Sequence, residues 1–378
     1  MVLLNITDVS ESVSPVTLND HWSRLARLIL LASLAALGSV GNVFMISAVM
    51  IEDYLRKRGE YNIRGSSEKS NKNLANYVSG NTFIVNVALA DLLVSGLVVP
   101  ASAIVILAGL RDNLAVCRFQ WFLATLCFLV TVLSLAAVAT ENYYRLCFSS
   151  GAYEKLTRGK ITAILLVFWI VCACISGVQF VGDVSFDYCR RKYLGLLPYQ
   201  ATVSVVMVLV PVLVTLFSYI RAGYQVRRFK SRPSFKAPNT FTWDNMLMHS
   251  NVYSFVVFVI FWLPFGVVLA VGTKRKIPDS IFYNLAWLAI SKSCVNSILY
   301  GISNQHFRGA YVNLFQYCCC KTTVTFSRRQ RPEGVRPSGD VRVHIIPGYN
   351  MYCSPQRSRD NQNKRISSRT NGREVYEL

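Results

Sequence analysis

The stretch "AISKSCVNSILYGISNQHFRGAY", residues 289–311, places one lysine, Lys292, near the middle of an apolar run. The run then passes Tyr300 and Gly301 into a polar and aromatic segment. An ammonium inside an apolar helix needs a partner, because burying a lone charge is strongly unfavourable. The fold therefore depends on what surrounds this run and on which group holds Lys292.

This stretch belongs to the last of seven apolar runs along a chain that is 52% hydrophobic and 16% charged. Each run is long enough to cross a hydrocarbon core of about 30 Å as an α-helix, and in lipid the backbone must satisfy its own hydrogen bonds. A soluble helical protein could bury one or two such runs, but not seven in series. We therefore expect an all-α, seven-transmembrane helix bundle. The runs are residues 25–50, 81–108, 117–146, 161–181, 199–221, 248–271 and 281–302.

Four parts follow from these runs. Residues 1–24 are expected to form an extracellular N-terminus, and 25–303 the transmembrane domain. Residues 304–320 carry apolar side chains at helical spacing and predict an amphipathic eighth helix on the membrane surface. Residues 321–378 are basic and polar, and predict a disordered cytoplasmic tail.

The distribution of basic residues predicts the orientation. Most of the 40 Lys and Arg residues lie in 51–80, 147–160, 222–247 and the segment after 303, which places these segments in the cytoplasm and the N-terminus outside a plasma membrane. The sequon at Asn5 would then accept a glycan.

Cysteines sort by compartment under this orientation. Cys117 and Cys189 fall outside, where the environment is oxidising, so they can pair. A cluster of three follows the amphipathic helix on the inner side and is placed for palmitoylation; the alternative is that its thiols stay free. The cluster is Cys318, Cys319 and Cys320.

A few polar side chains lie inside the apolar runs, where such groups are costly and usually functional. If the runs form one bundle, these groups can meet at one level of its interior. Pairing Lys292 with Asp91 keeps both charged at a lower cost than burying either alone. The alternative is that Lys292 extends along its helix to the membrane surface. The expected interior polar network is Asn42, Asp91, Thr131, Lys292, Ser293 and Asn296.

Several short motifs occur in order along the runs. Together with the seven runs they resemble the rhodopsin-like (class A) G-protein-coupled receptors over residues 35–317. Within that class, "SCVNSILYGISNQHFR", "ENYYRLCFSS" and "FVVFVIFWLPFGVVLAV" are most similar to the melatonin receptors and their orphan relatives. The motifs are Gly41-Asn42, "LADLL" at 89–93, Cys117, Trp169, Pro211 with Tyr219, "FWLP" at 261–264 and "NSILY" at 296–300.

The resemblance implies a receptor, not an enzyme, that transduces an extracellular ligand to heterotrimeric G proteins, with a tilt to the inhibitory class. It implies no cofactor and no nucleic-acid partner, and arrestin would bind the phosphorylated tail. An agonist would shift the side chains near Trp262 and let the sixth span swing outward at its inner end. The switch and G-protein contact residues are then Glu141, Asn142, Tyr143, Arg145, Tyr219, Asp244, Phe258 and Tyr300.

One departure from the class concerns its inner arginine, whose place is taken by Asn142. Arg145 lies one helical turn later on the same face and is a substitute. We expect Asp244 to accept a hydrogen bond from Asn142 at rest, which is weaker than the ion pair of the class and predicts raised basal activity. The alternative is a decoy or scaffold receptor with weak or no G-protein coupling.

The ligand site is expected around Trp262. Amine receptors of the class carry an aspartate where this chain has Ala124, which disfavours a monoamine. Gln179 stands where melatonin receptors carry a polar amide, but Met207 replaces their histidine, which disfavours melatonin.

The outer loops instead carry a basic rim that would attract an anionic ligand. The alternative is that these residues meet lipid headgroups. The rim is Arg190, Arg191, Lys192, Lys274, Arg275 and Lys276.

Three other classes of protein fit the sequence less well. An opsin has a lysine in the last span, but its place here is Ile290; Lys292 lies two residues later, turned by roughly 200°. A transporter or channel needs charges across the depth of the bundle, and the runs offer essentially one pair. An enzyme needs a nucleophile with a base or a metal constellation, and no such pattern appears.

Overall fold

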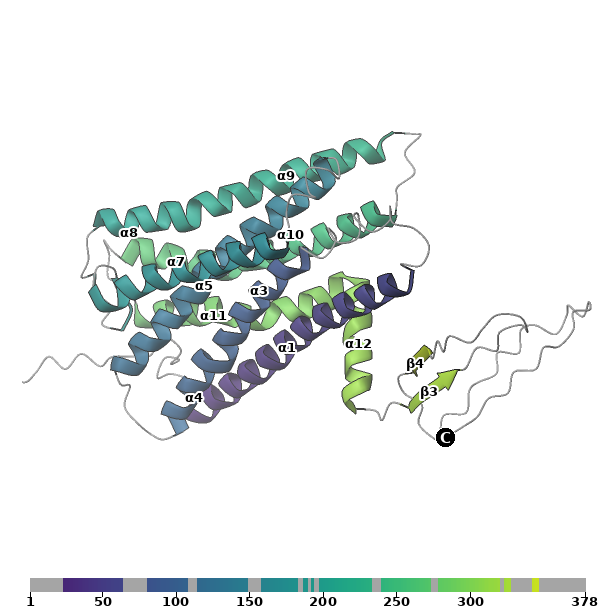
Figure 1. Cartoon of the computed structure of the whole chain (residues 1–378). Helices are drawn as coiled ribbons and strands as arrows, with labels where there is room; N and C mark the ends of the chain where they lie inside the picture. Colours follow the sequence, from purple (N-terminus) through teal and green to yellow (C-terminus); the bar gives the residue numbers. More distant parts are fainter. Residues whose placement is uncertain are drawn as a thin grey trace, which may run out of the picture. The chain divides into compact units, whose positions relative to one another are not determined.

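Long helices dominate the computed structural model, which describes residues 23–63, 80–107, 114–148, 158–182, 186–189, 192–193, 197–232, 239–272, 278–319, 323–327 and 342–346. In the larger unit of the chain, Met1–Arg308, they run side by side (Figure 1). The helical elements of this bundle are α1 (Arg24–Ile63), α3 (Gly80–Leu93), η2 (Val94–Val98), α4 (Val99–Leu107), α5 (Leu114–Cys147), α7 (Arg158–Gly182), α8 (Leu197–Ser204), η3 (Val205–Leu209), α9 (Val210–Lys230), α10 (Asn239–Gly272) and α11 (Asp279–Ser303).

Seven segments of these helices are long and apolar enough to cross a membrane. Each coincides with one of the apolar runs, so the predicted seven-helix bundle is confirmed. The segments are Leu25–Met50, Thr82–Ile104, Ala115–Cys147, Gly159–Val181, Pro198–Lys230, Asp244–Val271 and Ile281–Ser303.

Two spans contain a π-helical turn, and both turns have the same cause. Proline has no N–H to donate to the carbonyl four residues earlier. For Pro100 that carbonyl belongs to Gly96, inside η2, and for Pro211 it belongs to Met207, inside η3. The wider turn absorbs the missing hydrogen bond. Pro264 lies within α10, which continues through it as one helix.

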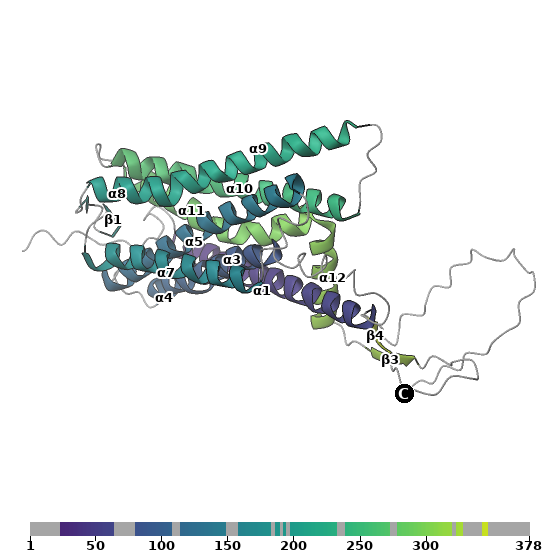
Figure 2. The same cartoon turned by 45° about the horizontal axis from the view of Figure 1, so that its top comes forward.

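Helix α5 lies at the centre of the bundle and packs against α3, α7, α9 and α10, as the views in Figures 1 and 2 also show. At the other side, α1 packs closely on α3, α4 and α11. A Cβ at Gly38 would collide with Ser95, and one at Gly41 would collide with Ser297. These two glycines therefore allow the close helix approach that small residues provide in membrane bundles.

Buried apolar side chains form distinct clusters within the bundle. One lies among η2, α5 and α7 and includes Val98, Val130 and Cys172. A second cluster, around the disulfide, contains Cys117, Tyr188, Cys189, Phe265, Val268, Phe282, Tyr283, Ala286 and Ala289. A third cluster joins α5, α9 and α10 in the part of the bundle away from the disulfide, and includes Tyr219, Phe255 and Phe258.

A short hairpin joins α7 to α8. Its strands β1 (Phe186–Asp187) and β2 (Lys192–Tyr193) pair in antiparallel fashion. Cys189, which follows β1, forms a disulfide with Cys117 at the start of α5. The predicted disulfide is therefore confirmed, and it fixes the hairpin to the helix at the centre of the bundle.

Helix α12 (Gln305–Cys319) follows α11 where the amphipathic helix was expected. Phe307 is buried near its start and packs on Tyr300, with ring centroids 5.2 Å apart. Cys320 and the side chains of Cys318 and Cys319 lie outside the described residues, so palmitoylation stays a prediction.

The second unit, Gly309–Leu378, contains a local departure from the expected tail. Strands β3 (Thr323–Ser327) and β4 (Arg342–Ile346) form an antiparallel pair. Their sequences, "TVTFS" and "RVHII", are rich in β-branched residues, and apolar and polar residues partly alternate along them, a pattern that favours a strand. The basic and polar composition of this segment does not reveal the alternation.

Candidate functional site

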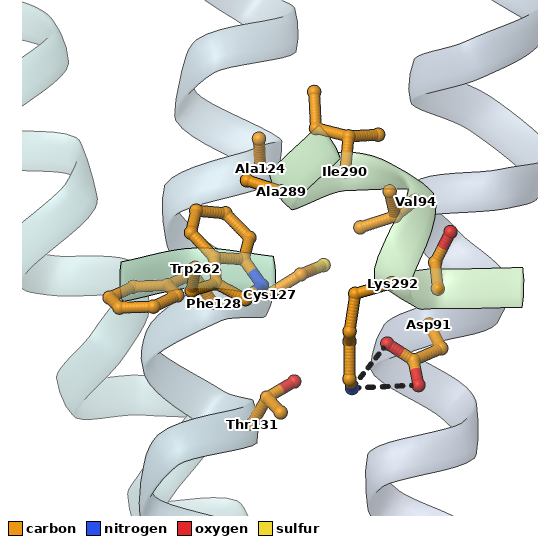
Figure 3. Close-up of a pocket in the computed structure, with 11 residues that line it drawn as sticks. Asp91, Val94, Ala124, Cys127, Phe128, Thr131, Trp262, Ala289, Ile290 and Lys292 are labelled. Atoms are coloured by element: carbon orange, nitrogen blue, oxygen red, sulfur yellow. Dashed lines mark hydrogen bonds and ion pairs between the residues drawn. The ribbon is translucent and has the colours of Figure 1, made fainter. Parts of the chain in front are cut away.

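A buried ion pair joins the second and seventh spans. Lys292 Nζ on α11 donates hydrogen bonds to both carboxylate oxygens of Asp91 on α3, each at 3.0 Å. The Lys292 side chain is 2% exposed and that of Asp91 is 5% exposed, so neither reaches the membrane surface. Figure 3 shows the lysine side chain running directly toward the carboxylate. The pairing expected from the sequence is therefore present, and the extension of Lys292 to the membrane surface is not.

Amide and hydroxyl groups complete the surroundings of this pair. Asn296 Nδ2 donates to Asp91 Oδ2 at 2.9 Å, and Asn296 Oδ1 accepts a hydrogen bond from Ser254 of α10 at 2.9 Å. Asn42 Nδ2, on α1, donates to the backbone carbonyl of Ser293 at 2.9 Å. The interior polar network thus connects α1, α3, α10 and α11 through buried hydrogen bonds, which are strong in a medium of low dielectric constant.

A small cavity lies between this network and the aromatic side chains of Phe128 on α5 and Trp262 on α10. Its volume is about 20 Å³, which is room for one water molecule. In Figure 3 Thr131 faces the same space as the Asp91–Lys292 pair. Trp262 and Phe128 lie on the opposite side of this space from the ion pair. The lining residues are Asp91, Val94, Ala124, Cys127, Phe128, Thr131, Trp262, Ala289, Ile290, Lys292 and Ser293.

Three aromatic rings connect the cavity to the sixth span. Trp262 lies 4.4 Å from Phe128 of α5 and 6.4 Å from Phe258, one turn earlier on α10, measured between ring centroids. Phe258 also stacks on Phe128 at 5.7 Å. The ammonium of Lys292 lies 5.8 Å from the centroid of Phe258, within range of a cation–π interaction. Any movement of α10 therefore changes the surroundings of the buried charge pair.

A second ionic cluster lies toward the far end of α5, away from the disulfide. Arg145 donates to Glu141 on its own helix at 2.8 Å and to Asp244 of α10 at 3.2 Å. The side chains of Arg145, Glu141 and Asp244 are 6%, 3% and 13% exposed, so water screens these contacts only weakly. The cluster holds the ends of the third and sixth spans together.

This arrangement corrects one sequence prediction. Asp244 was expected to accept a hydrogen bond from Asn142, but its partner is Arg145. The amide nitrogen of Asn142 is buried and forms no hydrogen bond with Asp244. The physical reason is reach: the long guanidinium of Arg145 spans the gap to α10, and it starts one turn nearer the helix end. The link at rest is consequently an ion pair. Raised basal activity was expected from a weaker contact, so this ion pair does not support it.

The other expected switch residues are placed as follows. The hydroxyl of Tyr300 donates to Asn251 of α10 at 2.5 Å. Tyr219 is buried in the third cluster, next to Phe255 at 6.3 Å between ring centroids. Tyr143 is half-buried and stacks edge-on against Phe217 of α9 at 6.2 Å.

Of the expected ligand-binding residues, Ala124 and Trp262 line the cavity. Met207 is buried in the η3 turn, and Gln179 is half-buried on α7 away from the cavity lining. The basic rim and the glycosylation sequon lie outside the described residues. This applies to Asn5, Arg190, Arg191, Lys274, Arg275 and Lys276, and to the side chain of Lys192.

The sequence reasoning missed a second buried hydrogen-bond chain. Asn86 Nδ2 donates to Ser134 Oγ at 2.8 Å, and Asn86 Oδ1 accepts from Trp169 Nε1 at 2.9 Å. This chain joins α3, α5 and α7. The signal was available, since Asn86 is one more polar residue inside an apolar run, and Ser254 is another.

These features define a seven-helix membrane receptor, and comparison with known proteins agrees. The family described as 7 transmembrane receptor (rhodopsin family) matches residues 69–300, more than half of the chain, so the chain belongs to this family. It is therefore a multi-pass plasma membrane protein from a family of receptors and not of enzymes.

Several melatonin receptors are similar to this chain. The chain is 31% identical over 271 residues to melatonin receptor type 1A of Ovis aries, covering 68% of this chain and 72% of that protein. It is 30% identical over 260 residues to melatonin receptor type 1B of Homo sapiens, covering 64% and 70%. It is 29% identical over 289 residues to melatonin receptor type 1B-B of Danio rerio, covering 71% and 79%. The chain is thus a G-protein-coupled receptor of the melatonin-receptor type.

Proposed function

We propose that this receptor carries an extracellular signal to heterotrimeric G proteins of the inhibitory class, and that the Arg145–Asp244 ion pair is its resting lock. The pair supports the proposal because it ties α5 to α10 at the end away from the disulfide. Opening α10 there would break a contact that is mostly shielded from water. An agonist would favour the open packing only through a difference in its affinity for the two packings.

Asn142 is the reason for a second candidate function, that of a decoy or scaffold receptor. Its amide nitrogen is buried and carries no charge, whereas the guanidinium that pairs with Asp244 comes from the next turn. A G protein that requires a charge at position 142 would couple weakly to such a surface. The two functions differ in one measurable respect, which is whether the opened receptor activates a G protein.

The test uses a variant that opens the lock without a ligand. Asp244→Asn should lower cyclic AMP in cells stimulated with forskolin, and pertussis toxin should abolish the effect. The matched control is Tyr253→Phe, on the same helix, because Tyr253 is 52% exposed and lies outside the lock. If Asp244→Asn reaches the cell surface and activates no G protein in a panel covering all classes, the decoy function replaces the proposal.

For the ligand we propose a molecule with negative charge, drawn by the basic rim defined above. The support is the composition of the outer loops alone. Melatonin, the ligand that the names of the relatives indicate, is disfavoured by Met207, a thioether buried in the η3 turn that offers no strong hydrogen bond. Replacing all six rim residues with Ala should weaken the potency of an anionic agonist at least about tenfold. If the potency of every agonist found is unchanged, the rim residues contact lipid headgroups and not the ligand.

The remaining proposals concern topology and the tail. The N-terminus lies outside with a glycan on Asn5, and the tail lies in the cytoplasm, lipidated at Cys318, Cys319 and Cys320 and recognised by arrestin once phosphorylated. Their support is the distribution of basic residues and the position of the cysteines. Tags at the two ends should be accessible on opposite sides of intact cells.

A further inference from the structure

One residue of the outer hairpin is buried as deeply as any core residue. Tyr188 directly precedes Cys189, in the turn that follows β1, and its relative exposure is 0%. Residues in connecting loops generally lie on the surface. A loop tyrosine with no exposed surface therefore fills a space between the helices.

Four aromatic side chains from three helices surround the ring of Tyr188. We call this set the aromatic box. The Tyr188 centroid lies 4.8 Å from that of Trp121, with the rings nearly parallel at 21°, and 5.1 Å from that of Phe282. The aromatic box consists of Trp121 from α5, Phe265 from α10, and Phe282 and Tyr283 from α11.

The aromatic box is connected to the cavity described above through the packing of Phe265. Phe265 lies 6.2 Å from Tyr188 on one side and 6.5 Å from Trp262 on the other, between ring centroids. Trp262 in turn lines the cavity over the Asp91–Lys292 pair. A single side chain, that of Phe265, thus separates the ring of Tyr188 from Trp262.

A covalent tether holds Tyr188 in this place. The neighbouring Cys189 is bonded to Cys117, four residues before Trp121 on α5. The disulfide therefore keeps the phenol at a high effective concentration over the box, as a short linker does for a bound group.

We propose that Tyr188 is a built-in occupant of the receptor's ligand site, and that the aromatic box is the part of this site that takes a flat aromatic group of phenol size. This deepens the proposed receptor function and rests on it. An incoming ligand displaces the Tyr188 ring and inserts an aromatic group of its own, and it activates the receptor only if its other contacts favour the open packing, because refilling the box alone restores the resting packing.

The occupied box belongs to the resting packing. The same structure that holds Tyr188 in the box also holds Arg145 on Asp244 at the opposite end of the bundle. Tyr188 bridges α5, α10 and α11, so it stabilises the packing in which these three helices are close at the outer end. Removing its ring withdraws that stabilisation and shifts the population toward the open packing.

The first experiment measures binding in purified receptor, with no G protein present. Tyr188→Ala should lower the melting temperature by roughly 5 °C or more, because it leaves an apolar cavity. Such cavities bind small aromatic molecules. 4-Methylphenol, which has the shape of the lost side chain, should restore the melting temperature of Tyr188→Ala in a saturable manner. It should leave the wild type and the matched control Tyr188→Phe unchanged.

The second experiment measures basal signalling in cells, normalised to the receptor detected at the surface. Tyr188→Ala should raise basal G-protein activation about twofold or more, and 4-methylphenol should return it toward the wild-type level. If Tyr188→Ala does not reach the surface, Tyr188→Leu provides the same comparison with a smaller void. Rescue of stability without basal signalling in any variant sinks the G-protein function and keeps the occupied site. Signalling that is unchanged in Tyr188→Ala, together with no stabilisation by 4-methylphenol, overturns the built-in occupant.

Discussion

Arg145 on α5 lies 3.2 Å from Asp244 on α10 while it contacts Glu141, one turn earlier on its own helix, at 2.8 Å. One guanidinium thus serves two carboxylates. Only the contact to Asp244 crosses between helices, and Glu141 competes with it for the same group. The strength of the lock between the two spans depends on how the guanidinium is shared.

Neutralising Glu141 tests this sharing. Glu141→Gln should leave Arg145 more strongly paired with Asp244 and lower basal signalling severalfold, since a charge-assisted contact contributes about 1.5–3 kcal/mol. Asp244→Asn should change basal signalling in the opposite direction. Basal cyclic AMP at equal surface expression is the measurement. Equal basal signalling in both variants would show that Arg145 does not act between the helices.

The buried pair of Asp91 and Lys292 predicts a strong asymmetry between single and double changes. Asp91→Asn and Lys292→Met each leave one buried charge without its partner and should cost about 3–5 kcal/mol. The double variant removes both charges and should recover most of that loss. Melting temperatures of the purified receptor in detergent report the difference. Additive losses would mean that the two charges do not stabilise each other.

The hydrogen-bond chain through Asn86 predicts a more modest effect. Trp169→Phe keeps the aromatic bulk but leaves Asn86 Oδ1 without its donor, and should lower stability by about 1–3 kcal/mol. Ser134→Ala removes the acceptor of the Asn86 amide and should act similarly. Combined with Asn86→Leu, either change should cost much less. A full loss in that background would place the role of Trp169 in packing alone.

The disulfide provides a fourth prediction. Cys117→Ser together with Cys189→Ser should lower the stability of the receptor by about 2–4 kcal/mol, because the bond closes a loop whose ends are 72 residues apart. Cys172→Ser, which changes a buried cysteine outside the disulfide, is the matched control. Thermal unfolding with and without a reducing agent measures the effect. A reductant that lowers the melting temperature of the double variant as much as that of the wild type would contradict the assignment.

Much of the bundle was predictable because the length of a membrane span can be recognised in the sequence. A helix that crosses lipid needs about 20 apolar residues, so the seven runs mark the seven spans. The pairing of Asp91 with Lys292 was predictable for a related reason. Charged residues are so rare in such runs that each of these two has few possible partners of opposite charge.

The contacts of long side chains were less predictable. Arg145 and Asn142 stand on neighbouring turns, and which of them reaches Asp244 depends on the gap between two helices, which no sequence period encodes. The burial of Tyr188 left no pattern at all, because a two-strand hairpin has no apolar periodicity to indicate an inward ring. Its partners, Trp121, Phe265 and Phe282, looked like ordinary aromatic residues of three separate spans.

The distance along the chain between Asp91 and Lys292 has a consequence for biosynthesis. They are 201 residues apart, so the ribosome incorporates Asp91 long before it incorporates Lys292. Throughout that interval the nascent second helix holds an acid whose counterion does not yet exist. A product truncated before its final helix keeps that defect permanently, and it offers the quality-control machinery of the cell a chemical mark of an unfinished polypeptide.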